Sequence, residues 1–325
     1  MDQTWQTGLR EAFRDPRALA DHLQIPLDRL PPLPENSVFP FLVPRAFAAR
    51  MVPNDPKDPL LLQVWPDAGE DVSEPGERDD PVGDRASALE PGLLNKYNGR
   101  ALVIASGACA IHCRYCFRRN FPYQESPPSE WTRHLDRLRS ETSLRECVLS
   151  GGDPLSLTDS VLNARVQDLA SIPHLATVRI HTRLPVALPA RVTPDLCRAL
   201  AGTRLRAVVV LHANHPSEID DRVRDAAGLL RKEGIQLLNQ SVLLRGINDR
   251  AEVLEALSVR LWDAGILPYY LHALDRVTGS SRFLVPDVEA SRLVRELRGR
   301  LPGYLVPRLV REIEGEDSKT PLSDS

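Results

Sequence analysis

The chain has 325 residues, of which 42% are hydrophobic and 26% charged, and its formal net charge is −3. These values exclude wholesale disorder, a collagen and a coiled-coil rod, and the charge balance gives no electrostatic case for a nucleic-acid surface. No apolar run approaches the roughly 18 residues that a membrane-spanning helix needs, and the first residues do not have the pattern of a secretory signal. We therefore expect a cytoplasmic protein that binds neither membrane nor nucleic acid.

Residues 1–92 are predicted to form a small helical subdomain and a connecting loop. Apolar residues recur at helical spacing from residue 5 to residue 23, and the prolines that follow end this helix. Residues 53–91 are rich in proline and acidic residues, which predicts a loop that runs along the surface and adds little to a core.

From about residue 100, short apolar runs alternate with amphipathic stretches six times. This alternation predicts parallel βαβ units. The predicted strands are 101–104, 146–149, 177–180, 205–211, 235–244 and 266–271, with a further run at 304–310. The predicted helices are 129–141, 159–171, 193–201, 217–233, 249–264 and 287–299.

Polar residues follow each predicted strand. Periodicity alone allows an open doubly wound sheet or a partial barrel. A doubly wound sheet gathers its functional residues at one switch point, whereas a βα-barrel gathers them at the C-terminal ends of all its strands. The repeated polar ends therefore favour an α/β fold with a partial (β/α)6-type barrel over residues 93–302, followed by a C-terminal strand and segment over 303–325.

The strongest motif is Cys109-Ala-Ile-His-Cys113-Arg-Tyr-Cys116 in the loop after the first predicted strand. Three thiolates at this spacing can bind three irons of a [4Fe-4S] cluster and leave the fourth iron open. Zinc and three unrelated buried cysteines are the alternatives, but a structural zinc site needs a fourth protein ligand. Cys147 and Cys197 are predicted to pack in the core, and the odd cysteine count indicates reduced thiols rather than disulfides.

The motif is similar to that of radical S-adenosylmethionine enzymes, and its surroundings resemble the lysine 2,3-aminomutase family from about residue 93 to residue 319. The stretches that carry this resemblance are Cys113-Arg-Tyr-Cys116-Phe-Arg118-Arg119-Asn-Phe121, Ser150-Gly-Gly-Asp-Pro-Leu155, Asn239-Gln-Ser-Val-Leu-Leu244 and Pro268-Tyr-Tyr270. The compact length and the ending Glu314-Gly-Glu-Asp-Ser-Lys319-Thr-Pro-Leu322 resemble the branch that makes β-lysine for elongation factor P.

The resemblance implies three cofactors: the [4Fe-4S] cluster, S-adenosylmethionine and pyridoxal 5′-phosphate. Gly151 and Gly152 match a stretch that binds the amino group of S-adenosylmethionine, and Gln240 and His212 match groups near that cofactor. Lys319 matches the lysine that holds pyridoxal phosphate as a Schiff base, the role such chemistry requires of a primary amine.

The position of Lys319 is also the most suitable among the four lysines of the chain, Lys57, Lys96, Lys232 and Lys319. Lys57 falls in the acidic loop and Lys232 at an exposed helix end, and Lys96 precedes the first strand, so we expect it at the wrong end of the barrel. Arg100 matches an arginine near pyridoxal phosphate.

The resemblance also implies the substrate groups. Arg118 matches an arginine that binds the substrate carboxylate, and Asp275 matches an acid that binds the ε-ammonium. The second acid of that pair lies seven residues before the Schiff-base lysine, which here is Glu312 instead of aspartate. Glu314 or Asp317 could substitute for it.

The implied reaction is an isomerisation, an intramolecular amino shift that converts L-α-lysine to β-lysine. The implied partners are L-lysine, an electron donor such as flavodoxin or ferredoxin, and, indirectly, elongation factor P with its lysyl-ligase; a homo-oligomer is possible for this family. The alternatives are an aminomutase for another amino acid and a non-catalytic iron–sulfur carrier or scaffold. The cysteine-bearing metal-binding tail of the catabolic aminomutases is expected to be missing.

Overall fold

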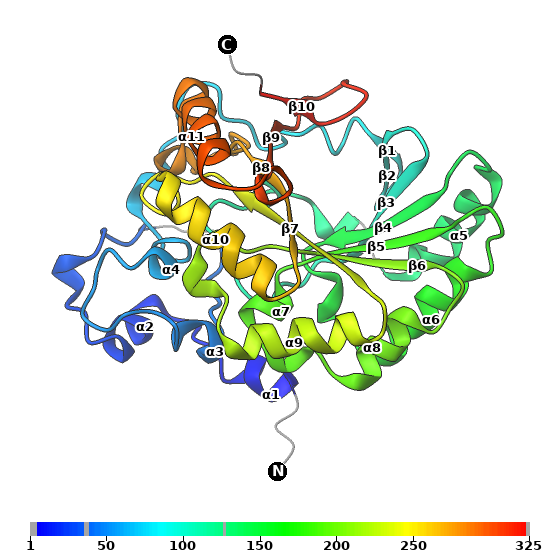
Figure 1. The fold of residues 1–325 in the computed structure, drawn as a ribbon, viewed down its shortest axis with the longest axis horizontal. Helices are drawn as coiled ribbons and strands as arrows, with labels where there is room; N and C mark the ends of the chain where they lie inside the picture. The colour runs from blue at the N-terminus through cyan, green and yellow to red at the C-terminus, as the bar shows by residue number, and fades with distance from the viewer. Residues whose placement is uncertain (1–4, 36–38, 126–127, 323–325) are drawn as a thin grey trace.

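In the computed structural model, which describes residues 5–35, 39–125 and 128–322, one sheet organises the fold. Its strands follow one another in chain order, β1 to β10 (Figure 1). They are β1 (Ala88–Glu90), β2 (Leu93–Tyr97), β3 (Arg100–Ser106), β4 (Glu146–Gly151), β5 (Thr177–Thr182), β6 (Arg206–Leu211), β7 (Gln236–Val242), β8 (Leu267–His272), β9 (Arg308–Arg311) and β10 (Thr320–Pro321).

The strands from β3 to β9 are all parallel, and antiparallel pairs close the two edges. A doubly wound sheet would change direction and permute its strand order, whereas sequential order is that of a βα-barrel. β1 and β10 do not pair with each other, so the sheet stays open. The expected α/β partial barrel is confirmed.

The long helices after β3 cover the outer side of this curved sheet (Figure 1). They are α5 (Trp131–Ser140), α6 (Asp159–Ala170), α8 (Pro194–Ala201), α9 (Asp221–Lys232), α10 (Ala251–Asp263) and α11 (Asp287–Arg300), with the short α7 (Leu184–Ala187) after β5. All six lie where sequence periodicity predicts them. The last strand is shorter than expected, because residues 303–305 form a 3₁₀ turn before β9.

Alternation along the strands divides the sheet into an apolar face and a cavity face. Val178 and Ile180 of β5 pack in the main core between the sheet and the helices. Their neighbours Arg179 and His181 face the other way and line a cavity. The register pairs Leu102 with Val148 and Val148 with Arg179, and all three line that cavity. The inner face of the barrel therefore forms a ligand-sized space.

The N-terminal region contains two helices where one was predicted, α1 (Trp5–Arg10) and α2 (Pro16–His22). Pro16 starts a new helix, and Asp15 caps it by accepting a hydrogen bond from the backbone N–H of Arg17. Between the two helices, Phe13 forms a β-bridge with Val43. Local chain-breaking residues thus override the helical periodicity.

The acidic stretch 53–91 is more than a surface loop, so that prediction is wrong. It contains the short helix α4 (Pro59–Leu62), whose Leu60 and Leu61 are fully buried; with α3 (Arg45–Ala48) it builds a second core that also includes Ile111 of the cysteine loop.

The predicted boundary between residues 92 and 93 falls between β1 and β2, and the division into 1–92, 93–302 and 303–325 stays a prediction. No helix in the described ranges is long and apolar enough to cross a membrane.

Candidate active site

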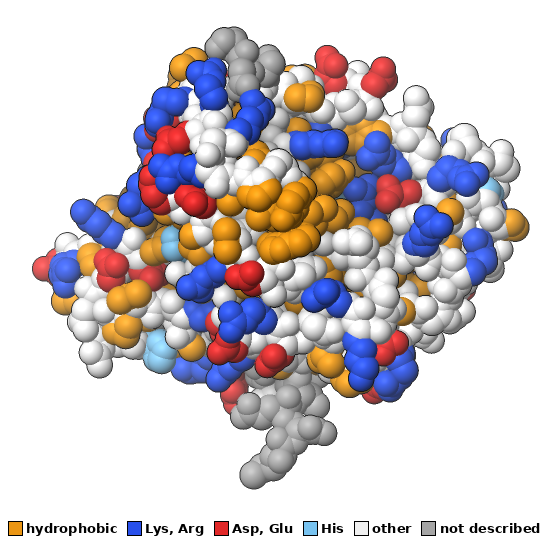
Figure 2. All heavy atoms as spheres, in the orientation of Figure 1, with side chains coloured by type: hydrophobic (Ala, Val, Ile, Leu, Met, Phe, Trp, Pro, Cys, Tyr) orange, Lys and Arg blue, Asp and Glu red, His pale blue; other side chains and the backbone are white. Residues whose placement is uncertain are grey.

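A cavity of about 440 Å³ lies at the C-terminal ends of the barrel strands, between the cysteine loop and the C-terminal segment. Figure 2 shows hydrophobic side chains gathered in the middle of one face, between α10 and α11 on one side and β4 to β6 on the other. Every residue expected at a cluster, cofactor or substrate site lines this cavity: Arg100, Cys109, Cys113, Cys116, Arg118, Gly151, Gly152, His212, Gln240, Asp275, Glu312 and Lys319. The structure therefore brings the whole predicted set together, and their individual roles stay predictions.

The three cysteines of the loop face the cavity as free thiols. Burial raises the pKa of Cys116 to about 11, with a further contribution from Cys113, and burial and the neighbouring thiols likewise raise the pKa of Cys109. A metal that binds these thiols must displace their protons. Cys147 and Cys197 are buried in the apolar core, as predicted.

Cysteine thiolates are the ligands that iron–sulfur clusters use. Among the described residues, no three His, Cys, Asp or Glu side chains gather closely enough to hold one metal ion. An iron–sulfur cubane carries its thiolates on separate irons and therefore needs ligands that stand apart around it. The donor set of the loop fits such a cluster.

Gly151 and Gly152 hold the end of β4 against the cysteine loop. Gly151 has a φ of +123°, and a Cβ there would lie 2.3 Å from the carbonyl oxygen of Ser106; a Cβ on Gly152 would lie 2.5 Å from that of Ala108. The backbone N–H of Gly152 donates to Ser106 at 2.7 Å. The two glycines are thus required by the packing of the loop itself, in addition to any close approach of a ligand.

Two buried carboxylates from the acidic stretch fix the arginines of the cysteine loop. Glu70 accepts hydrogen bonds from Arg114 and Arg119. Asp84, which is 1% exposed, pairs with Arg118 at 2.6 Å and with Lys96 at 2.7 Å. Although burial opposes ionisation, these two cations lower the pKa of Asp84 to about 2, so it is a carboxylate at neutral pH. The N-terminal region therefore contributes charged groups to the cavity wall.

The predicted position of Lys96 is wrong. Lys96 lies on β2, which forms a hairpin with β3 through Asn98-Gly99 and runs antiparallel to it. Its ammonium consequently reaches the cavity instead of the opposite end of the barrel, where it lies 3.3 Å from Glu312. Lys96 and Lys319 therefore line the same cavity and contact the same carboxylate, that of Glu312.

The hairpin of β9 and β10 explains the seven-residue offset between Glu312 and Lys319. Arg311 pairs with Thr320 across the hairpin, which places the residues just inside it opposite each other. The ammonium of Lys319 contacts the carboxylate of Glu312. Against the effect of burial, Lys319 and Lys96 lower the pKa of Glu312 to about 2. The alternatives Glu314 and Asp317 are exposed and do not line the cavity.

Asp275 follows β8 and lines the same cavity as Glu312. Burial raises the pKa of Asp275 to about 7, an effect that Lys319 partly offsets and Glu312 reinforces. A cation that binds beside a carboxyl group stabilises its ionised form and lowers its pKa. Asp275 is therefore placed to accept an ammonium group of a ligand.

Three histidines in the cavity are neutral. Burial and Arg183 lower the pKa of His212 to about 3, and burial and Lys319 do the same for His272. Burial, Arg179 and Lys319 hold the pKa of His181 well below its ordinary value. The Nε2 atoms of His181 and His272 are buried without a hydrogen-bond partner among the described residues. In the sequence, the only signal of both histidines is that each is a polar residue at the end of a predicted strand.

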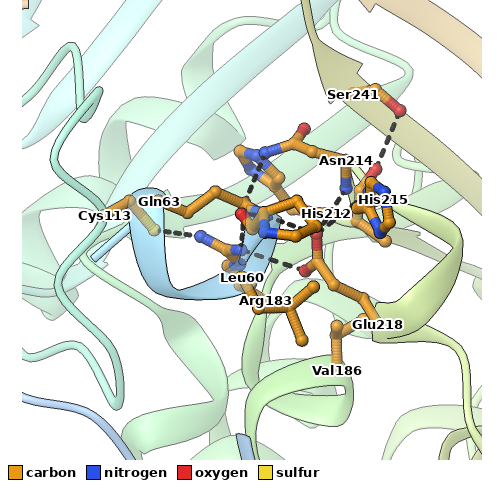
Figure 3. Close-up of polar contacts among 12 residues, drawn as sticks. Leu60, Gln63, Cys113, Arg183, Val186, His212, Asn214, His215, Glu218 and Ser241 are labelled. Atoms are coloured by element: carbon orange, nitrogen blue, oxygen red, sulfur yellow. Dashed lines mark hydrogen bonds and ion pairs between the residues drawn. The ribbon is translucent and has the colours of Figure 1, made fainter. Parts of the chain in front are cut away.

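The buried side chain of Arg183, beside Cys113, is a further polar group of the site that the sequence analysis does not predict. Arg183, at the end of β5, donates from Nη1 to the sulfur of Cys113, and its Nη2 lies 2.9 Å from Glu218 (Figure 3). The sequence signal was the position of Arg183 directly after a strand. Nothing in the sequence connects it with Glu218 or with Gln63 of the N-terminal region.

Comparison with known proteins gives the class first. The radical SAM superfamily model matches residues 103–257, which run from β3 into α10. This part of the chain contains the cysteine loop and the barrel strands β3 to β7, so the fold is that of a radical SAM domain.

Relatives of nearly full length give the family. The chain is 44% identical to an L-lysine 2,3-aminomutase of Haemophilus influenzae, over 98% of this chain and 95% of the relative. It is 45% identical to the L-lysine 2,3-aminomutase of Escherichia coli, over 98% and 94%. A third such enzyme, from Clostridium subterminale, is 36% identical over 83% of this chain and 65% of its own length. The chain belongs to the lysine 2,3-aminomutase family of radical SAM enzymes.

Proposed function

We propose that the protein is a radical SAM, pyridoxal phosphate-dependent isomerase that converts L-α-lysine to β-lysine. The observation that carries this proposal is the content of a single cavity. The cavity joins three free thiols, a lysine next to a carboxylate, and a second acid with a raised pKa. An iron–sulfur carrier or scaffold would need the thiols alone.

The three cysteines would hold a [4Fe-4S] cluster, and Lys319 would hold pyridoxal phosphate. When bound, the cluster with S-adenosylmethionine supplies one-electron hydrogen abstraction, and pyridoxal phosphate supplies the aldehyde that carries the migrating amino group. The proposed site of S-adenosylmethionine is supported by Gly151, Gly152, His212 and Gln240, which line the cavity together with the cysteines. Arg100 lines the same cavity as Lys319, which supports its proposed role near pyridoxal phosphate.

The cavity offers charged groups of the sign that each end of lysine needs. Arg118 offers a guanidinium that suits an α-carboxylate, and Asp84 holds this guanidinium in place from its Nε side. Asp275 and Glu312 offer carboxylates for the ε-ammonium, which is tolerated away from water only when it is paired. A substrate with a side-chain carboxylate, such as glutamate, would meet repulsion from both acids.

The remaining parts of the proposal rest on the family resemblance. A small electron-transfer protein such as flavodoxin or ferredoxin would reduce the cluster. The resemblance to the branch that serves elongation factor P makes the modification of that factor, through its lysyl-ligase, the proposed destination of β-lysine.

The substrate assignment predicts a selective defect in Asp275→Asn. The substitution keeps the shape and removes the charge, and the loss of one charge-assisted contact costs about 2–4 kcal/mol, or roughly 30- to 1,000-fold in kcat/KM for lysine. The loss should grow from pH 6 to pH 8, because the Asp275 carboxyl ionises with a pKa of about 7 while the ε-ammonium, with a pKa of about 10.4, stays charged.

Steady-state kinetics of both proteins across this pH range test the prediction, with Asp195→Asn on the exposed surface of α8 as the matched control. Iron content and pyridoxal binding should stay normal in both variants. If Asp275→Asn turns over lysine as well as the parent at pH 8, the ammonium is bound elsewhere and Glu312 is the next residue to replace.

A further inference from the structure

Arg183 is a buried cation in contact with one of the proposed cluster ligands. The residue is 6% exposed and lies between the end of β5 and the start of α7. Its guanidinium is oriented with Nη1 toward the sulfur of Cys113 and Nη2 toward the carboxylate of Glu218, as Figure 3 shows. The positive end of this pair therefore faces the cysteine loop.

The orientation of the guanidinium is fixed by a dense set of polar groups. Nη1 also donates to the hydroxyl of Tyr115 at 2.6 Å, and Nη2 donates to the side-chain oxygen of Gln63 at 2.7 Å. Glu218 is fully buried and is itself held by Gln63 at 3.1 Å and by the backbone N–H of Asn214 at 2.9 Å. Because these groups come from the N-terminal region, the cysteine loop and the segment after β6, Arg183 has little freedom to turn away.

Such a cation is costly to bury unless its charge is matched. Glu218 matches it on the side away from the loop. On the other side Nη1 donates to the sulfur of Cys113, which would carry a negative charge as a ligand of the proposed cluster. A guanidinium is always protonated in proteins, so Cys113 faces a permanent positive charge and a hydrogen-bond donor.

Hydrogen bonds to ligand sulfurs and the net charge nearby are two determinants of the reduction potential of an iron–sulfur cluster. Reduction adds one negative charge, which a neighbouring cation stabilises. Cys116 also lies near two cations, Arg118 and Arg119, whose charges oppose the rise of its pKa. Among the hydrogen bonds of the described residues, only Cys113 accepts one from a cationic side chain at its sulfur.

We propose that Arg183 is a positioning residue that raises the reduction potential of the cluster through Cys113, and that Glu218 moderates this effect. The inference deepens the proposed function and depends on the cluster it assigns to the cysteine loop. Removing Arg183 should make the cluster harder to reduce, whereas removing the charge of Glu218 should make it easier to reduce.

The test is a redox titration of the anaerobically reconstituted full-length protein, followed by electron paramagnetic resonance of the reduced cluster. For Arg183→Gln we expect the ratio of reduced to oxidised cluster at a fixed potential to fall at least tenfold, which is about 59 mV for a one-electron couple. Glu218→Gln should shift the ratio in the opposite direction, and Arg183→Lys should shift it less than Arg183→Gln.

Arg165→Gln is the matched control, because Arg165 is equally buried but lies on α6 and donates to the backbone of Ala105, away from the cysteines. It should titrate as the parent does. A merely structural role of Arg183 predicts lower stability without shifts of opposite sign, so the pair of shifts is the decisive readout.

The inference is overturned if Arg183→Gln titrates as the parent does, or if both charge-removing variants shift the same way. If Arg183→Gln does not fold, Glu218→Gln decides: an unchanged or lower potential overturns the inference, and a higher one supports it. A parent protein that assembles no cluster at all overturns the proposed function as well, whereas a normal parent with unshifted variants overturns this inference alone.

Discussion

Cys113→Ala should lose the iron–sulfur absorbance and the reductive cleavage of S-adenosylmethionine together. With one of three thiolates gone, two ligands remain for a cluster that needs three protein thiolates beside its open iron. The substitution also takes away the sulfur that Arg183 contacts. We expect cleavage of S-adenosylmethionine to fall to background, measured as 5′-deoxyadenosine formed by the dithionite-reduced protein, and iron content to fall with it.

Cys197→Ala provides the matched control for this experiment. Cys197 is a buried thiol of α8 that packs in the main core, so its loss affects packing without affecting the cluster. Its iron content and cleavage rate should match those of the parent. Full cleavage activity in Cys113→Ala would contradict the assignment of the loop as the cluster site.

Lys319→Arg should prevent covalent attachment of pyridoxal phosphate and reduce β-lysine formation by at least about 1,000-fold, because arginine keeps the positive charge beside Glu312 but cannot form the imine. The measurement is borohydride reduction of the holoprotein followed by peptide mass spectrometry. In the parent, the reduced pyridoxyl group should be found on the peptide that contains Lys319.

Lys96→Arg is the control that the structure makes necessary, since Lys96 reaches the same cavity and the same carboxylate. It should keep the pyridoxyl label on Lys319. The two amines differ in their surroundings: Lys96 is held by Asp84, Glu312 and the backbone carbonyl of Val82, whereas Lys319 contacts Glu312 from a terminal hairpin. Labelling of Lys96 in the parent would show that the family resemblance misplaces the pyridoxal site.

The barrel was predictable because its signals are local and repeated. Each parallel strand is a short apolar run and each outer helix an amphipathic stretch, so the periodicity alone locates them. The edge strands β1 and β2 have no such signal apart from the Asn98-Gly99 pair, which is typical of a tight hairpin turn. The missed hairpin is the reason why the position of Lys96 was wrong.

The candidate site was predictable where residues carry a motif, as the cysteines, the two glycines and Lys319 do. It was not predictable where tertiary packing pairs residues that are far apart in the chain. Asp84 reaches Arg118 across 34 positions and Arg183 reaches Gln63 across 120. Asp84 lies in a stretch whose composition predicts solvent exposure, and it is buried because Arg118 and Lys96 compensate its charge.

Product analysis with labelled lysine tests the central claim most directly. The anaerobically reconstituted protein is incubated with S-adenosylmethionine, pyridoxal phosphate, a reductant and α-¹⁵N-lysine, and the products are separated and identified by mass spectrometry and NMR. We predict β-lysine with the label moved from the α- to the β-carbon, and no such product when either cofactor is omitted. Cleavage of S-adenosylmethionine without any migration of the label from lysine would contradict the assignment of the protein as a lysine aminomutase.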